Sequence, residues 1–355
     1  MRIFKFSFMS SVLMLLTLFQ VVQAASGDVL YPVYKDKKWG YIDQSGNVVV
    51  DFKYDRTSTF SEGFGVVSLK KPEKKVYLID AKGDILFEIP DTISRMDPFS
   101  HGLAVVKDKE TKLFGYMDTK GKIVIPFKYQ YAQAFSEGLA KVEYKDEQGE
   151  RRVGYIDTEG KLAFEADKWL KGNFSDGLAH IRTVKNDKFV YGFIDKSGKV
   201  VIEPRFRKIA PFSEGLAFAK ENGKILMIDK KGKTVITFEF ETGDFETFPV
   251  FSDGYAKLYY KWKLPGNKWG FINKDGEVAF PELAISSMRT PFSEGRAWIM
   301  LKGSKDLVLI DTKGKVLVKV PDAKKPEKFQ DGLSPVFMKD RSIRYYNRDG
   351  ELVWK

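Results

Sequence analysis

From about residue 30 onward, short runs of aromatic and β-branched residues alternate with turns rich in Asp, Asn and Gly. The runs 41–42 and 48–50, on either side of the turn 43–46, have the composition of β-strands. Other runs, such as 103–106 and 139–142, alternate with a period of two, as half-buried strands do. No segment beyond residue 30 has the period of a helix. The pattern predicts an all-β protein.

Two turn motifs recur along the chain, which indicates tandem repeats. The first, Asp-x-x-Gly or Asn-x-x-Gly, occurs nine times between residues 43 and 350, in steps of 34 to 44 residues that average 38. Its Asp or Asn can accept backbone N–H bonds, and its Gly tolerates a positive φ, so each copy predicts a hairpin turn. The second motif, Phe-Ser-Glu-Gly or a variant, is called the connector here. It begins at Phe60, Phe99, Phe135, Phe174, Phe212, Phe251, Phe292 and Phe329.

Each copy of about 38 residues contains three clear strand segments and a weaker fourth, such as 129–134, often entered through a proline such as Pro126. Short antiparallel strands in this number are typical of a β-propeller blade, so a β-meander array of the propeller type is our first expectation. Hairpins number nine and connectors eight, and no strand exchange between the ends is evident. An open β-solenoid therefore remains the alternative.

The segments 38–43 (KWGYID) and 268–273 (KWGFIN), each followed by a Gly turn and a connector, carry a family resemblance. The chain from about residue 30 to 355 resembles the WG-repeat (KWG repeat) family of bacterial proteins. Trp-Gly itself stands only at Trp39 and Trp269, and Leu226 and Val308 replace the Gly in two copies. The resemblance implies a tandem β-repeat module, often exported, without an established activity.

Residues 1–24 have the features of a signal peptide: Arg2 and Lys5, an apolar run at 12–19, and small side chains at Val22 and Ala24. We expect cleavage after Ala24 and a repeat domain over 25–355 with eight repeats plus a ninth terminal hairpin. A retained membrane anchor is the alternative, but the apolar run is shorter than the roughly 20 residues that span a bilayer. The expected location is periplasmic or extracellular.

The sequence contains no Cys, which excludes disulfides, a thiol nucleophile and an acylated lipoprotein anchor. Loss of Arg2 and Lys5 with the signal would lower the formal net charge from +11 to +9. This charge favours an anionic envelope glycan or lipid headgroup, or a protein partner. The alternative is that the lysines only keep strand edges soluble.

Catalytic groups are scarce. His101 stands at a connector position that is acidic in the other copies, His180 lies within a strand, and no triad or zinc motif surrounds either. We therefore predict no catalytic residue, metal or cofactor. The connector acids could face a central channel and bind cations or a sugar, but more simply each accepts backbone N–H bonds at its own Ser-Glu-Gly turn or pairs with a Lys of the next copy. They are Glu62, Glu137, Asp176, Glu214, Asp253, Glu294 and Asp331.

The longest step, from Asp229 to Asn273, contains the candidate binding residues Tyr259, Tyr260, Lys261, Trp262 and Lys263. In a strand, Tyr260 and Trp262 would share one face and the other three residues the opposite face. Aromatic rings beside lysines can stack on sugars or pair with anions. The alternative is a long hairpin whose rings pack on the next copy.

The C-terminal basic and aromatic residues resemble a nucleic-acid surface, but the predicted export argues against it, and we expect a terminal cap with solvated arginines. They are Arg341, Arg344, Tyr345, Tyr346 and Arg348.

The sequence thus predicts an exported, non-catalytic binding or scaffold repeat protein that presents an aromatic and basic surface to a cell-envelope component or a protein partner. One alternative is a polysaccharide hydrolase or lyase with carboxylates from non-equivalent repeats. Another is a purely structural spacer.

Overall fold

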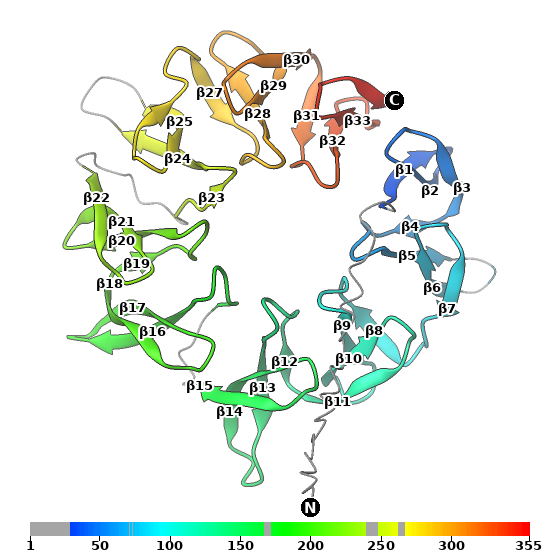
Figure 1. Cartoon of the computed structure of the whole chain (residues 1–355). Coiled ribbons are helices and arrows are strands. Elements are labelled where there is room, and N and C mark those ends of the chain that lie inside the picture. The colour runs from blue at the N-terminus through cyan, green and yellow to red at the C-terminus, as the bar shows by residue number, and fades with distance from the viewer. Residues whose placement is uncertain (1–28, 71, 73, 167–171, 239–247, 262–266) are drawn as a thin grey trace, which may run out of the picture.

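The computed structural model describes residues 29–70, 72, 74–166, 172–238, 248–261 and 267–355. Within these residues there is no helix, and 34 strands form nine antiparallel sheets. The sheets stand around a common centre as blades of a ring (Figure 1). We number the blades 1 to 9 in chain order.

Blade 1 contains β1 (Tyr31–Lys35), β2 (Lys38–Ile42) and β3 (Val48–Tyr54). Blade 2 contains β4 (Arg56–Thr57), β5 (Phe64–Leu69), β6 (Lys75–Asp80) and β7 (Ile85–Glu88). Blade 3 contains β8 (Ile93–Met96), β9 (Leu103–Asp108), β10 (Phe114–Asp118) and β11 (Ile123–Tyr129). Blade 4 contains β12 (Tyr131–Ala132), β13 (Ala140–Lys145), β14 (Arg151–Ile156) and β15 (Leu162–Ala166). Blade 5 contains β16 (Ala179–Lys185), β17 (Lys188–Ile194) and β18 (Val200–Phe206). Blade 6 contains β19 (Lys208–Ile209), β20 (Leu216–Glu221), β21 (Lys224–Asp229) and β22 (Thr234–Phe238). Blade 7 contains β23 (Phe251–Ser252), β24 (Tyr255–Lys261), β25 (Asn267–Asn273) and β26 (Val278–Ala279). Blade 8 contains β27 (Ile285–Met288), β28 (Arg296–Leu301), β29 (Leu307–Asp311) and β30 (Val316–Val320). Blade 9 contains β31 (Ala323–Pro326), β32 (Leu333–Met338), β33 (Ile343–Asn347) and β34 (Leu352–Trp354).

Every blade is a meander in which each strand pairs with its neighbour in the chain. In blades 2 and 6, the short first strands β4 and β19 lie nearer the centre of the ring than the last strands β7 and β22 (Figure 1). The connector joins the first and second strands, and the Asp-x-x-Gly turn joins the third and fourth. Blade 1 begins directly with its second-strand equivalent, β1, and so has no connector.

Both turn motifs have the geometry that their residues favour. In the first connector, Glu62 and Gly63 have φ values of 52° and 82°, as a two-residue hairpin turn of type I′ requires. In the first Asp-x-x-Gly turn, the Asp43 carboxylate accepts the N–H groups of Ser45 and Asn47 at 2.9 and 2.8 Å, and Gly46 has a φ of 88°. The sequence prediction of hairpin turns is confirmed at both motifs.

The Gly of Trp-Gly allows the fourth strand to cross closely over the third. In blades 1, 3 and 5 the register shifts at this position, so the fourth strand bulges. A Cβ on Gly40, Gly115 or Gly192 would lie 2.2–2.6 Å from a carbonyl oxygen of that strand. In blades 6 and 8, where Leu226 and Val308 stand instead, the pairing runs straight through. The three blades with this bulge all carry the Gly, although Gly154 of blade 4 has the Gly without the bulge.

Aromatic contacts between neighbouring blades form much of the core. A ring from the third strand of one blade packs against the connector Phe of the next, as in Tyr41–Phe60, with ring centroids 5.0 Å apart. The pairs Tyr155–Phe174 and Phe193–Phe212 repeat this contact at 5.1 and 4.6 Å. Large rings at the same place in successive copies hold each blade to the next.

The ring is closed by packing between blade 9 and blade 1, a contact we call the seam. Tyr31 packs on Tyr345 with ring centroids 5.7 Å apart, and the Tyr345 hydroxyl donates to the carbonyl oxygen of Pro32 at 2.7 Å. Gly46 lies against Val353, just as the corresponding Gly83 lies against Val50 of the blade before it. In the described residues β1 pairs only with β2, so no shared sheet spans the seam. The closed β-propeller is confirmed, and the open β-solenoid alternative was wrong.

Candidate functional site

The connectors form a chain of hydrogen bonds around one side of the ring. A connector Ser donates its hydroxyl to the Phe carbonyl of the next connector, at 2.8 Å from Ser61 to Phe99 and 2.7 Å from Ser136 to Phe174. The same bond is made by Ser100, Ser175, Ser213 and Ser293. Across blade 1, the Gln330 side-chain amide donates to the Phe60 carbonyl at 3.4 Å. The connectors at Phe251 and Phe292 are joined instead through the Asp253 carboxylate, which accepts the Gly295 N–H at 2.6 Å, so the eight connectors close a ring inside nine blades.

The connector acids reinforce this chain. Glu62 accepts the backbone N–H groups of His101 and Gly102 at 2.7 and 2.9 Å. Each later acid that makes the bond accepts the Gly N–H of the next connector; these acids are Glu137, Asp176, Glu214, Asp253 and Glu294. These acids do accept backbone N–H bonds, but the donor lies in the connector of the next blade and not in the acid's own turn, which we had expected.

Lysines and arginines from Asp-x-x-Gly turns neutralise four of these acids, because connectors and turns lie on the same side of the ring. The Lys196 ammonium lies 3.1 Å from a Glu137 oxygen, and Lys230 lies 2.6 Å from Asp176. Lys274–Glu214 and Arg348–Glu294 are the equivalent pairs, at 2.8 and 3.0 Å.

The pKa values of these acids follow from that geometry. Burial alone would raise the pKa of Glu137, but the hydrogen bond from Gly177 N–H and the Lys196 ammonium outweigh burial and hold the pKa below its ordinary value. The pKa of Asp176 is likewise lowered: Lys230 and the Gly215 N–H outweigh burial. These acids are ionised and engaged, which suits a structural role better than proton transfer.

Both histidines have structural surroundings. His101 replaces the acid in its connector, and its Nε2 accepts the Gly138 N–H at 3.1 Å. His180 stacks on Phe193 with ring centroids 6.1 Å apart, and burial lowers its pKa. Among the described residues, no group of three or more His, Asp or Glu side chains is arranged to hold a metal ion.

The candidate binding residues of the longest repeat lie in blade 7. The backbone of Tyr259, Tyr260 and Lys261 ends β24 and pairs with that of β25. Trp262 and Lys263 lie outside the described residues. This site stays a prediction.

The C-terminal basic residues belong to a complete blade rather than to a terminal cap. Tyr345 and Tyr346 are buried, and Arg348 pairs with Glu294 of blade 8. Arg341 and Arg348 are exposed, as expected of solvated arginines, whereas ring closure buries the two tyrosines.

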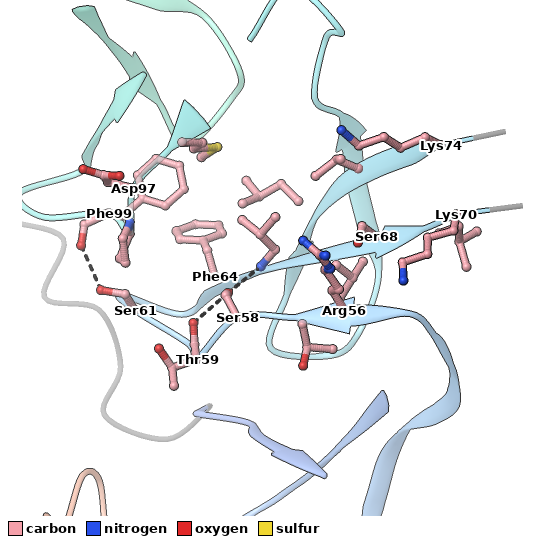
Figure 2. A pocket seen from close by; sticks show the side chains of 18 residues that line it. Arg56, Ser58, Thr59, Ser61, Phe64, Ser68, Lys70, Lys74, Asp97 and Phe99 are labelled. Atoms are coloured by element: carbon pink, nitrogen blue, oxygen red, sulfur yellow. Dashed lines mark hydrogen bonds between the residues drawn. The ribbon is translucent and has the colours of Figure 1, made fainter. Parts of the chain in front are cut away.

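A cavity of about 510 Å³ lies between blades 2 and 3. Its apolar wall includes Phe64, Leu78, Met96 and Phe99. Figure 2 shows the Phe64 and Phe99 rings at one end, and the side chains of Arg56, Lys70 and Lys74 at the other. Ser58, Thr59, Ser61 and Ser68 add hydroxyls to the lining.

Asp97 is the acid among the lining residues that the structure describes, and its charge is already matched. The Arg95 guanidinium binds both Asp97 oxygens, at 2.6 and 3.0 Å. Outside the lining, the Asp55 carboxylate accepts the Lys70 backbone N–H at 2.8 Å and pairs with the Lys38 ammonium at 2.9 Å. The cationic end of the cavity therefore keeps a positive excess from Arg56, Lys70 and Lys74.

The cavity exists because blade 2 lacks an aromatic residue at one cross-strand pair. In each blade the second and third strands place two directly opposed residues on the face toward the next blade. In eight blades at least one member of the pair is aromatic: Pro32–Tyr41, Val105–Tyr116, Lys141–Tyr155, His180–Phe193, Phe218–Met227, Lys257–Phe271, Trp298–Leu309 and Pro335–Tyr345. Blade 2 has Val66–Leu78.

The comparison of blades shows how the space is filled elsewhere. Where the third strand carries Met227 or Leu309 instead of a ring, the second strand supplies Phe218 or Trp298, both fully buried against the next blade. Blade 2 has neither solution, and Val66 lines the open space. Sequence reasoning on single motifs missed this cavity, but alignment of the nine copies at the Val66 and Leu78 positions would have found it.

Fold and site define a closed nine-bladed β-propeller built from tandem repeats. The sequence matches the family model described as "WG containing repeat" at residues 39–71, 114–147, 191–224 and 269–305. Each match begins in the third strand of an odd-numbered blade and extends into the next blade. The chain belongs to the WG-repeat family.

Solved structures align with most of this chain at low sequence identity. A crystal structure of a eukaryotic initiation factor is 13% identical, with 91% of this chain and 94% of that chain aligned at a TM-score of 0.60. BamB from Moraxella catarrhalis is 10% identical over 89% and 96% of the two chains, with a TM-score of 0.36. Apo AztD from Citrobacter koseri is 12% identical over 91% and 92%, with a TM-score of 0.39. The first of these supports the propeller architecture.

No curated protein matches the sequence. In the part of the chain that the structure describes, no helix has the length and apolar character to cross a bilayer.

Proposed function

We propose that the protein is an exported, non-catalytic binding or scaffold protein whose outer surface docks a cell-envelope component or a protein partner. The observation that carries this proposal is a series of exposed apolar side chains on the last strands of the blades, next to the Asp-x-x-Gly turns. Val48, Val49, Val200 and Val201 are 38–43% exposed, and Ile85, Leu86, Val124, Leu162, Val235 and Leu352 continue the series. We call it the rim series.

The rim series suits a partner for two reasons. In the part of the chain that the structure describes, no further layer covers these edge-strand side chains, so they are available to another molecule. Lysines stand close by in sequence, for example Lys199 beside Val200 and Lys53 after the strand residues 48–50. Apolar contact and a basic charge together favour an amphipathic, anionic envelope surface.

The alternative of a polysaccharide hydrolase or lyase requires free carboxylates from non-equivalent blades. Six connector acids, Glu62, Glu137, Asp176, Glu214, Asp253 and Glu294, already accept backbone N–H bonds. A purely structural spacer would leave the rim series without a role. Both observations favour binding.

The test compares capture of partners by the protein and by a variant with Val48, Val49, Val200 and Val201 all changed to Thr. Threonine keeps the β-branched shape and the strand preference, so the fold should be retained while the apolar surface is lost. We expect the natural protein to enrich a defined envelope component after cross-linking, and the variant to enrich it at least tenfold less.

Lys305→Gln, an exposed change in the hairpin between β28 and β29 and away from the rim series, is the control and should capture the component normally. Equal capture by the valine variant would overturn the proposed surface. Saturable turnover of an envelope polysaccharide by the natural protein would overturn the non-catalytic assignment.

A further inference from the structure

The cavity between blades 2 and 3 differs from the other blade contacts because one packing position is left open in one copy of a repeat. Val66 and Leu78 occupy a pair that carries an aromatic ring in each of the other blades. The resulting space of about 510 Å³ is within the range of small-molecule sites. A repeat array that fills this position eight times can fill it a ninth time, so the opening is a local property of blade 2.

The lining divides the cavity into two chemically different ends. The end near the connectors is formed by Phe64, Leu78, Met96 and Phe99, and Met96 can adapt its shape to a flexible ligand. The other end carries Arg56, Lys70 and Lys74 (Figure 2). Among the described residues of the lining, the one acid is Asp97, and its carboxylate is held by Arg95.

We infer that this cavity binds an amphipathic anion, with its apolar part against Phe64 and Phe99 and its anionic group beside Arg56, Lys70 and Lys74. The apolar end gains from removal of hydrocarbon surface from water. The guanidinium of Arg56 can bind a carboxylate or a phosphate through two parallel N–H bonds, and the two lysines add charge. A neutral ligand would gain only from burial of its hydrocarbon part, and a cationic ligand would be repelled by Arg56 and the two lysines.

A second space of about 780 Å³ adjoins the first, and both are lined by Val66, Lys74, Val76 and Met96. Its lining is more polar and includes Lys75, Arg95 and Lys109 together with Glu88 and Asp91. A ligand longer than the first cavity can therefore extend past Lys74 along the blade contact. This site is separate from the rim series, so the inference does not depend on the proposed function.

The test uses four ligands with the same ten-carbon chain and different head groups: decanoate, decyl phosphate, decanol and decyltrimethylammonium. Titration calorimetry on the purified protein, below the micelle concentrations, should show saturable one-to-one binding of the two anions. Decanol should bind at least tenfold more weakly, and the cation should not bind. A preference for decanoate identifies a carboxylate ligand, and a preference for decyl phosphate identifies a phosphorylated lipid; either supports the inference.

Two variants fill the cavity in the way that other blades do. Val66→Phe copies Phe218, and Leu78→Tyr copies Tyr41, Tyr116 and Tyr155. Each should weaken anion binding at least tenfold while the melting temperature stays the same or rises. The two changes enter from different strands, so the test stands if one of them misfolds.

The double variant Arg56→Gln/Lys70→Gln should weaken binding of both anions at least tenfold and leave decanol binding unchanged. Lys122→Gln is the charge control and should bind as the natural protein does. Undiminished anion binding by folded Val66→Phe and Leu78→Tyr would overturn the assigned site. Equal binding of all four ligands, or no binding of either anion, would overturn the assigned ligand class.

Discussion

At the scale of single residues, a glycine without a side chain decides how closely two strands can cross. Gly192 lies under the bulge of β18, where an added Cβ would be 2.2 Å from the Ile202 carbonyl oxygen and 2.7 Å from the Pro204 nitrogen. Gly154 holds the same repeat position in blade 4, but the pairing there is straight and the nearest atom is the Leu162 Cδ1 at 2.6 Å. The same motif residue therefore faces rigid backbone in one blade and a flexible side chain in another.

Gly192→Ala and Gly154→Ala should consequently differ in cost. We expect Gly192→Ala to lower the free energy of unfolding by about 1–3 kcal/mol or more, because the backbone of β18 must move. Gly154→Ala should cost less than about 1 kcal/mol, because the 41% exposed Leu162 can change rotamer. Urea denaturation of both variants checks the prediction. Equal losses in the free energy of unfolding would show that the bulge does not determine the effect of adding a Cβ at this glycine.

At the scale of elements, the connectors act as latches between blades. The latch from blade 4 to blade 5 combines the Ser136 hydroxyl, the Glu137 carboxylate and the Gly177 N–H, and Lys196 of the next turn adds charge. Net contributions of about 0.5–1.5 kcal/mol per hydrogen bond are modest, but the latches recur around the ring. Their common chemistry makes the ring sensitive to acid.

The double variant Glu137→Gln/Asp176→Asn should lower stability by about 1–3 kcal/mol at pH 7. Both pKa values are lowered in the folded protein. The unfolded chain therefore takes up protons first as the pH falls, and the stabilisation is present above the ordinary carboxyl range and lost below it. Denaturation midpoints between pH 7 and 3 should fall less steeply in the variant than in the natural protein.

Glu159→Gln, an exposed acid in the turn of blade 4, serves as the matched charge control. Its pH profile should follow that of the natural protein. A double variant with the same pH slope as the control would show that the latches carry no pH-dependent stability.

At the scale of the whole molecule, the ring is joined at the seam by side chains alone. Tyr31, Val33, Ile42, Leu333 and Tyr345 form a buried cluster there. Since no strand crosses from one terminal blade into the other in the described residues, the seam depends on this packing.

Two substitutions at Tyr345 should separate the contribution of its hydroxyl hydrogen bond from that of its ring packing at the seam. Tyr345→Phe keeps the ring and loses the bond to Pro32, at a cost of about 1 kcal/mol. Tyr345→Ala should cost about 3–5 kcal/mol. Amide hydrogen exchange should then accelerate first in blades 1 and 9, and uniform acceleration in all blades would contradict a weak seam.

Much of the architecture could be predicted from local chemistry, and the part that could not depends on contacts between copies. The turns at Asp43 and Glu62 follow from their own residues. Ring closure depends on Tyr31 meeting Tyr345, about 300 residues away, which no spacing rule reveals. The cavity depends on what Val66 and Leu78 lack relative to their counterparts, so it is visible only when all copies are compared.

The alternation of blades sets a limit on the symmetry of the ring. Bulged fourth strands occur in blades 1, 3 and 5, connectors reading Phe-Ser-Glu-Gly begin at Phe60, Phe135, Phe212 and Phe292 in the even blades, and the family matches start in the odd ones. These features therefore repeat every two blades. In a closed ring of nine blades a two-blade pattern cannot alternate without a break, so two odd-numbered blades, 9 and 1, must be neighbours. The break in the alternation lies at the seam between blades 9 and 1. Because the ring therefore has no rotational symmetry, each blade has neighbours or a position in the ring that no other blade has.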